Sequence, residues 1–126
     1  MINVERQIDY WKSAANEDLI TADWLIQGSR FKEGLFFCHL AIEKILKALV
    51  VKQIKDIPPK THDLFLLVKK AEIKLEENDL DFLGILMNYQ IEGRYPQFLY
   101  ELPNKKMIDS YYQHTADLLL WMKSKF

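Results

Sequence analysis

The sequence is poor in glycine and proline, with four residues of each among 126. Because these residues mark most tight turns, many-stranded sandwiches and barrels are not expected. Long uncharged runs are also missing, and none approaches the ~18 residues that form a membrane span. We therefore expect long, regular elements joined by few turns, and no association with a membrane.

Cysteine is almost absent, since Cys38 is the only one. One cysteine allows no internal disulfide, and the residues that follow Met1 lack the apolar segment of a signal peptide. We therefore expect a cytoplasmic protein. A chain of this length buries roughly two thirds of its unfolded surface, so we expect residues 1–126 to fold as a single domain.

Neither sign of charge dominates, because 17 lysines and arginines stand against 18 aspartates and glutamates. The chain has no basic half of the kind that marks a nucleic-acid footprint. One local stretch is basic, and it is either a solvated surface or a rim for a phosphate-bearing ligand. Its lysines are Lys44, Lys47, Lys52, Lys55 and Lys60.

What the sequence does contain is apolar residues that recur at three- and four-residue steps through five segments, a pattern that predicts helices and no strand. Short connections between long helices favour antiparallel neighbours. The predicted fold class is all-α, an up-down four-helix bundle with a short additional helix. The expected helices cover residues 4–27, 30–53, 62–74, 79–92 and 104–123, with Asn3, Ser29, Thr61 and Asn78 as N-caps and Gly28 ending the first helix.

The second expected helix is apolar around most of its circumference. Such a helix is either central in the fold or shared between a core and an oligomer interface. The excess of apolar surface predicts a homodimer, for which a two-fold interface is the default solution. Aromatic residues expected to add to this surface are Trp24, Phe98 and Tyr100.

Two groups of polar residues fall on apolar helix faces. Asp18 lies within the apolar stripe of the first helix, where a carboxylate needs a partner. It is either a structural ion pair or hydrogen bond, or an acid of a functional site. His39, Glu43 and Lys47 follow one another at four-residue steps and therefore share one face of the second helix.

Catalytic and metal-binding signatures are not found. A zinc site needs three or four ligands. His62 and Asp63 could complete a set with His39 and Glu43, but nothing in the spacing requires it. Four glycines cannot form a glycine-rich phosphate loop, and no Gly-x-Ser-x-Gly elbow occurs. We therefore expect no catalytic residue, no metal and no cofactor.

Several segments together are similar to a known family. The sequence FFCHLAIEK at 36–44 resembles the second helix of HEPN domains, and PKTHDL at 59–64 resembles the segment that follows it. ANEDL at 15–19 resembles the first helix of the family, and Arg94-Tyr95-Pro96 resembles the end of the fourth.

The resemblance implies a helical bundle that often forms a homodimer. HEPN domains are commonly encoded beside small nucleotidyltransferases, as two-component systems of the toxin–antitoxin kind. Many are metal-independent ribonucleases that carry an arginine at a helix end and a histidine five or six residues later. Arg94 would be that arginine, but no histidine follows in this window, and the next is His114. The proton transfers of RNA cleavage then lack a group at the expected place, so we expect no enzyme activity.

Three hypotheses follow. The first is a non-enzymatic, nucleotide- or phosphate-binding partner of a small nucleotidyltransferase. The second is a HEPN-type ribonuclease with a rearranged site, and the third is a purely structural dimerising bundle. Arg94 either offers its guanidinium to a nucleotide or RNA, or ties helices together through Glu92, Asp18 or Glu43. The candidate ligand-binding residues are His39, Glu43, Lys47, His62 and Arg94.

Overall fold

The computed structural model of the protein describes residues 2–90 and 102–126. In this part of the chain there are five helices and no strand, so the predicted all-α class is confirmed. None of these helices is both long enough and apolar enough to cross a membrane. The helices are α1 (Val4–Gln27), α2 (Phe31–Ile54), α3 (Leu64–Ala71), α4 (Glu77–Met87) and α5 (Lys105–Lys123).

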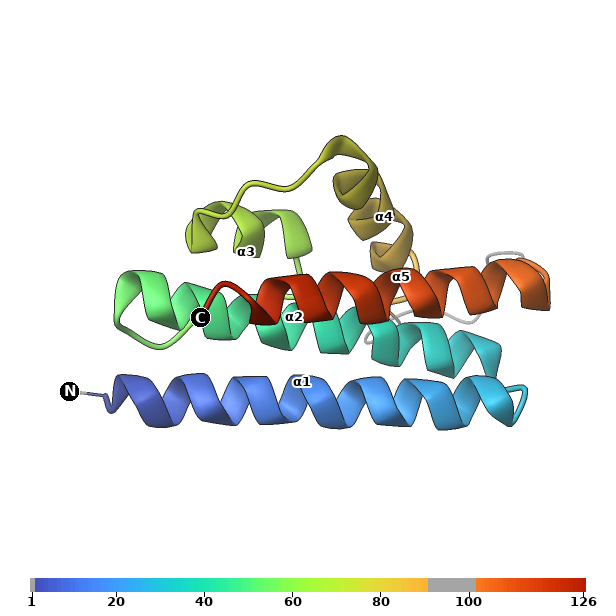
Figure 1. Ribbon diagram of the computed structural model, residues 1–126, viewed down its shortest axis with the longest axis horizontal. Helices are drawn as coiled ribbons and strands as arrows, with labels where there is room; N and C mark the ends of the chain where they lie inside the picture. Colours follow the sequence, from blue (N-terminus) through green and yellow to red (C-terminus); the bar gives the residue numbers. More distant parts are fainter. Residues whose placement is uncertain (1, 91–101) are drawn as a thin grey trace.

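The other four described helices pack around α2 (Figure 1). α1 lies beside α2 and runs in the opposite direction, as the short connection between them predicts. α5 also packs along α2 and contacts α1, but it runs in the same direction as α2. The shorter α3 and α4 cover the side of α2 that faces away from α1.

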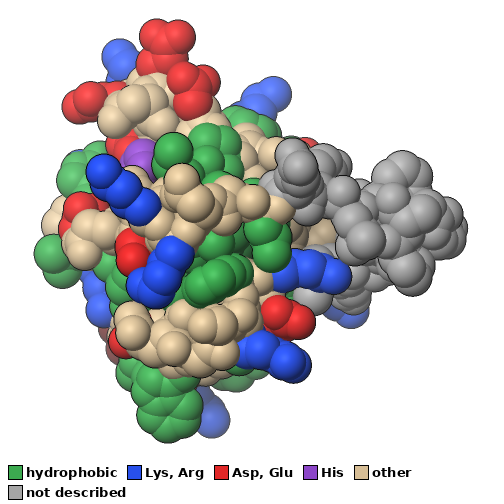
Figure 2. Space-filling model, turned by 90° about the vertical axis from the view of Figure 1, so that its right-hand side faces the viewer, with side chains coloured by type: hydrophobic (Ala, Val, Ile, Leu, Met, Phe, Trp, Pro, Cys, Tyr) green, Lys and Arg blue, Asp and Glu red, His purple; other side chains and the backbone are tan. Residues whose placement is uncertain are grey.

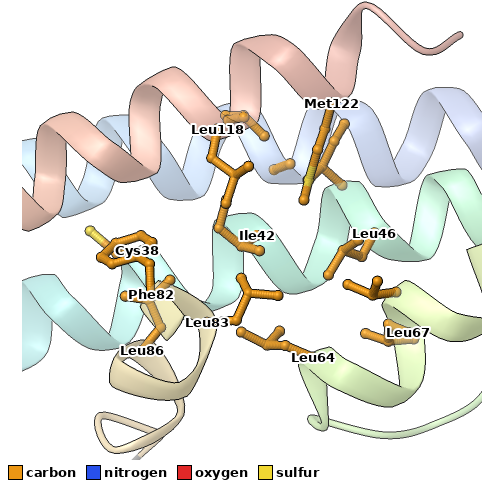
Figure 3. Close-up of a cluster of buried hydrophobic side chains, with 14 of the residues drawn as sticks. Cys38, Ile42, Leu46, Leu64, Leu67, Phe82, Leu83, Leu86, Leu118 and Met122 are labelled. Atoms are coloured by element: carbon orange, nitrogen blue, oxygen red, sulfur yellow. The ribbon is translucent and has the colours of Figure 1, made fainter. Parts of the chain in front are cut away.

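The core is built around α2, of whose 24 residues 14 are buried. Most of its apolar surface is therefore covered within one chain. The argument from α2 to a homodimer loses its basis, and the homodimer itself stays a prediction. Figure 3 shows the packing of side chains from four helices, with Cys38, Ile42 and Leu46 of α2 facing Leu64 and Leu67 of α3, Phe82, Leu83 and Leu86 of α4, and Leu118 and Met122 of α5.

The ends of α1 agree with the sequence, whereas the start of α2 does not. Asn3 caps α1 by accepting a hydrogen bond from the backbone N–H of Arg6 at 3.1 Å, and Gly28 ends the helix. Ser29, the predicted cap of α2, instead adopts a left-handed conformation with φ of 62°. Arg30 takes the cap position without a side-chain hydrogen bond.

The caps of α3 and α4 also differ from the prediction. Asp63, not Thr61, caps α3, because its carboxylate accepts hydrogen bonds from two backbone N–H groups of the first turn. Thr61 instead accepts from the backbone N–H of Asp63, and α3 begins two residues later than expected. Glu76 rather than Asn78 holds the cap position of α4.

An ion pair connects α1 and α2. Asp18 is buried on α1, and its Oδ2 lies 2.7 Å from Nζ of Lys44 on α2. The side chain of Lys44 is 26% exposed, so its ammonium group retains contact with water. Of the alternatives that the sequence left open for Asp18, the structure shows the ion pair.

Gly34 allows α1 and α2 to approach closely. A Cβ atom at this position would stand 2.6 Å from Cγ1 of Ile26 and 3.3 Å from the backbone oxygen of Ala22. Both residues are buried on α1, so neither can move aside without disturbing the core.

We predict that Asp18→Asn lowers the free energy of unfolding by about 1–3 kcal/mol, because Lys44 loses its counter-charge. This magnitude lies between those measured for exposed and for buried ion pairs. Chemical denaturation monitored by circular dichroism measures the change. Asp9→Asn, at an exposed position of the same helix, is the control and should shift stability by less than about 0.5 kcal/mol. Equal midpoints for the two variants would show that the ion pair contributes nothing.

We predict opposite effects for two glycine-to-alanine substitutions. Gly34→Ala should destabilise the fold by about 1–3 kcal/mol, because the overpacking against Ile26 exceeds the gain in helix propensity. Gly84→Ala on α4 should stabilise by about 0.5–1 kcal/mol, since its Cβ would meet only Cζ of Phe65 at 3.8 Å. Denaturation midpoints that move in the same direction would contradict the close approach of α1 and α2.

Candidate functional site

The four-residue spacing on α2 produces a buried polar face. His39, Glu43 and Lys47 are exposed by 0%, 3% and 7%, respectively. Such groups are stable in a protein interior only when they bond to one another. The segment 55–63, which leads from α2 to α3, brings His62 to the same place. We call His39, Glu43, Lys47 and His62 the Glu43 cluster.

The carboxylate of Glu43 is the centre of this cluster. Its Oε2 accepts a hydrogen bond from Nζ of Lys47 at 3.0 Å, and its Oε1 lies 2.8 Å from Nδ1 of His62. Nδ1 of His39 lies 3.8 Å from the same Oε1. Four of the five candidate residues from the sequence are therefore brought together.

His39 and Glu43 hold His62 from two sides. Nε2 of His39 lies 3.2 Å from the backbone carbonyl oxygen of His62. A carbonyl oxygen only accepts hydrogen bonds, so Nε2 of His39 carries the proton and donates it. Burial lowers the pKa of His39 below its ordinary value, against the opposing effect of the Glu43 carboxylate. His39 is thus a neutral structural donor that fixes the main chain at His62.

Only His62 gives the cluster substantial contact with solvent. Its side chain is 39% exposed, whereas that of Glu43 is 4% exposed and that of Lys47 9%. The ammonium group of Lys47 also lies over the ring of Trp11, 5.3 Å from its centroid, which is within the range of a cation–π contact. Glu43 and Lys47 therefore balance each other inside the protein.

The basic stretch of the sequence does not form a rim of available lysines. Lys44 pairs with Asp18, Lys47 pairs with Glu43, and Lys52 donates to the backbone oxygen of Lys125 near the end of the chain. Tertiary packing brings Asp18 and Lys125 close from distant parts of the sequence, whereas Glu43 lies one turn from Lys47 on the same helix. Lys55 and Lys60 are exposed and lie in the segment that carries His62.

Three residues of the sequence predictions lie outside the described residues. They are Arg94, which completes the candidate set, and the aromatics Phe98 and Tyr100. The role of Arg94 in binding therefore stays a prediction.

Sequence reasoning missed a second polar contact, which joins α4 to α5. Nε2 of His114 lies 2.7 Å from Oδ1 of Asp79. The ring of Phe82 stacks on the imidazole with centroids 3.9 Å apart. The pair borders a cleft of about 280 Å³ that Trp121 also lines. Asp79 and Phe82 lie on α4 and His114 lies on α5, so the spacing of residues within one helix does not predict this contact.

Neither Cys38 nor a cluster of metal-binding groups adds reactive chemistry in the described part of the chain. The thiol of Cys38 is fully buried, and burial raises its pKa to about 12, so it stays protonated and unreactive at neutral pH. Within residues 2–90 and 102–126, no three or more His, Cys, Asp and Glu side chains are grouped to hold a metal ion.

The HEPN domain family model matches residues 8–125. No curated protein sequence matches the chain significantly. The crystal structure of TT1696 from Thermus thermophilus is similar to this one, with a TM-score of 0.80 and 17% sequence identity. The match covers 95% of this chain and 98% of TT1696. At this identity the likeness concerns the fold alone.

We predict that His39 makes stability depend on pH. Its pKa is lowered in the folded state, so the unfolded chain binds more protons below its ordinary pKa of about 6.5. Its contribution is therefore complete above about pH 6.5 and is lost as the pH falls towards the lowered value. His39→Gln, which retains a donor for the His62 carbonyl, should lose less stability than the parent between neutral pH and about pH 5.

Denaturant titrations of both proteins across this pH range provide the measurement. The variant keeps Glu43, Lys47 and His62, so the difference between the two proteins isolates His39. An identical pH dependence would mean that His39 is not the group whose protonation opposes folding.

Proposed function

Because the chain belongs to the HEPN domain family, we propose that it is a cytoplasmic, non-enzymatic protein that binds a nucleotide or another phosphate-bearing ligand. In this proposal it is the partner of a small nucleotidyltransferase, in a two-component system of the toxin–antitoxin type. The observation that carries the ligand-binding part is the placement of His62, the member of the Glu43 cluster that reaches the surface.

His62 is fixed before any ligand arrives. Glu43 holds its ring through Nδ1, and His39 holds its backbone carbonyl. Both holding groups are buried on α2, which is the central helix of the fold. A side chain that is already ordered loses little entropy on binding, so its contacts contribute more of their energy to affinity.

The preference for an anionic ligand comes from Arg94, because the charges of the segment that carries His62 balance one another. Lys55 and Lys60 are exposed in this segment, as are Asp56 and Asp63, and the negative charge of Glu43 is balanced by Lys47. The family resemblance adds Arg94, whose planar guanidinium group matches the oxygen atoms of a phosphate. These groups together suit a phosphate better than a neutral ligand.

The same geometry argues against a ribonuclease. Cleavage through the 2′-hydroxyl group needs groups that move protons at the substrate. His39 is fully buried, and its Nε2 is engaged by the His62 carbonyl, so it cannot reach a substrate. The residues that follow Arg94, where the family carries its histidine, include no histidine. His39 and His62 could replace the missing histidine only beside Arg94, and of the two only His62 retains access to solvent.

We predict that the parent protein binds ATP, AMP or inorganic pyrophosphate in isothermal titration calorimetry. Arg94→Lys should weaken binding by about tenfold or more, because a point charge cannot replace the planar fork. His62→Gln should weaken it similarly. Arg30→Lys, an exposed arginine at the start of α2, is the matched control and should bind like the parent. Thermal midpoints verify that all variants fold.

Two results would overturn this function. Failure of all three probes to bind would remove the ligand-binding part. Specific cleavage of labelled RNA in the presence of chelator, abolished by Arg94→Ala at unchanged stability, would establish the ribonuclease instead. The partner role has a separate test, in which the chain is co-expressed with a nucleotidyltransferase encoded beside it. Separate elution of the two proteins in size-exclusion chromatography would refute the partnership.

A further inference from the structure

A cleft between α4 and α5 lies outside the Glu43 cluster and has no role in the proposed function. Its volume is about 280 Å³, and its walls come from the segment before α4, the first turn of α4 and α5 from His114 onward. Leu75 and Leu118 form an apolar part of the wall, and the indole ring of Trp121 forms another. Sites for whole small-molecule ligands usually measure about 300–1,000 Å³, so this cleft better fits a single side chain.

The charged residues of the cleft are mostly acidic. Glu76, Asp79 and Asp117 line it together with one lysine, Lys74. Among the described residues, none of the three carboxylates forms an ion pair with a lysine or an arginine. A cleft lined mainly by charges of one sign concentrates ions of the opposite sign. We therefore expect its ligand to be a cation.

The carboxylate of Asp79 is held in place before a ligand arrives. Nε2 of His114 lies 2.7 Å from Oδ1 of Asp79 and donates to it, since a carboxylate has no proton to give. The buried ring of Phe82 stacks on the imidazole with centroids 3.9 Å apart. These contacts fix Asp79 in advance, so a ligand that bonds to its other oxygen orders little more of the protein.

The acids of the cleft suit an extended cation better than a metal ion. In residues 2–90 and 102–126, no three His, Cys, Asp and Glu side chains are grouped closely enough to hold a metal. A guanidinium group carries five N–H donors in one plane, bonds to carboxylates and stacks on aromatic rings. The ring of Trp121 already attracts a cation of its own chain, because Nζ of Lys125 lies 4.4 Å from its centroid.

We propose that this cleft binds an arginine side chain that protrudes from a basic segment of a partner protein. The guanidinium group stacks on Trp121 and donates to the carboxylates of Asp79 and Asp117. The methylene groups of the arginine pack on Leu75 and Leu118. None of these residues belongs to the Glu43 cluster, so the inference does not depend on the proposed function.

The surface around the cleft selects a protein segment over a free small cation. Figure 2 shows acidic side chains at the upper edge of the molecule, where Figure 1 places the turn into α4. Glu72, Glu77 and Asp81 are exposed in this region and extend the negative surface beyond the residues that line the cleft. Only a ligand longer than the cleft reaches these charges, and a segment with further basic residues complements them.

Peptide titration tests the chemistry of the ligand. The probe is acetyl-Lys-Arg-Lys-amide, and in its control citrulline, which has the same shape but no charge, replaces arginine. Isothermal titration calorimetry at low salt should show that the parent binds the arginine peptide about tenfold more tightly or better. Agmatine, a free alkylguanidinium, should bind more weakly than the peptide, because it does not reach the surrounding acids.

Three results of this titration would overturn the proposal. Failure of the arginine peptide to bind, or equal affinity for the citrulline peptide, would reject the guanidinium as the recognised group. Agmatine that binds as tightly as the peptide would reject a protein segment as its source.

Substitutions test the place of binding. Trp121→Ala and Asp117→Asn should each weaken the arginine peptide by about threefold or more, because one removes the stacking surface and the other a charged acceptor. The matched controls are Trp24→Ala, at a tryptophan of α1 that is 76% exposed, and Asp109→Asn, at an exposed position of α5 outside the cleft. Both controls should bind like the parent, and thermal midpoints verify that all four variants fold.

The exposed position of Asp117 keeps the test valid if the loss of Trp121 disturbs folding. Equal affinities of the test and control variants would place the peptide elsewhere on the protein and reject the cleft.

Discussion

The structure depends on the burial of α2. Fourteen of its 24 residues are buried beneath the other helices and the adjoining segment, and three of them, His39, Glu43 and Lys47, are polar. A helix enclosed in this way cannot turn such groups towards water, so they must satisfy one another or draw in partners. His62 supplies that partner for Glu43. The arrangement of the candidate site is therefore a direct consequence of how α2 is packed.

The sequence predicted the long helices well because their signals are strong and local. The bounds of α1 were predicted without error, since Asn3 and Gly28 act where expected. The ends of α3 and α4 were harder to predict, because several capping residues compete within a few positions. Thr61 and Asp63 both accept backbone hydrogen bonds, and only the structure shows which one begins the helix. The shared direction of α2 and α5 is a tertiary property that local periodicity does not contain.

The candidate site was predictable to the extent that it follows from one helix. Four-residue spacing places His39, Glu43 and Lys47 on one face, and family resemblance added His62, which lies 19 residues from Glu43. The contact of His114 with Asp79 spans 35 residues and two helices, and nothing in the spacing marks it. The sequence could not show that Lys44 and Lys52 are engaged within the protein. Their partners, Asp18 and the backbone oxygen of Lys125, lie far away in the sequence.

α1 supports the candidate site from the side of α2 that faces it. Its inner side supports the Glu43 cluster, since the ring of Trp11 lies beside the ammonium group of Lys47. The ring of Tyr10, which is exposed on the outer side of α1, makes an edge contact with Trp11, with centroids 5.0 Å apart. A continuous series of contacts therefore runs from Tyr10 through Trp11 and Lys47 to Glu43. The hydrogen bonds of the cluster nevertheless close within one chain. Glu43 and His39, which orient His62, therefore act without a second chain.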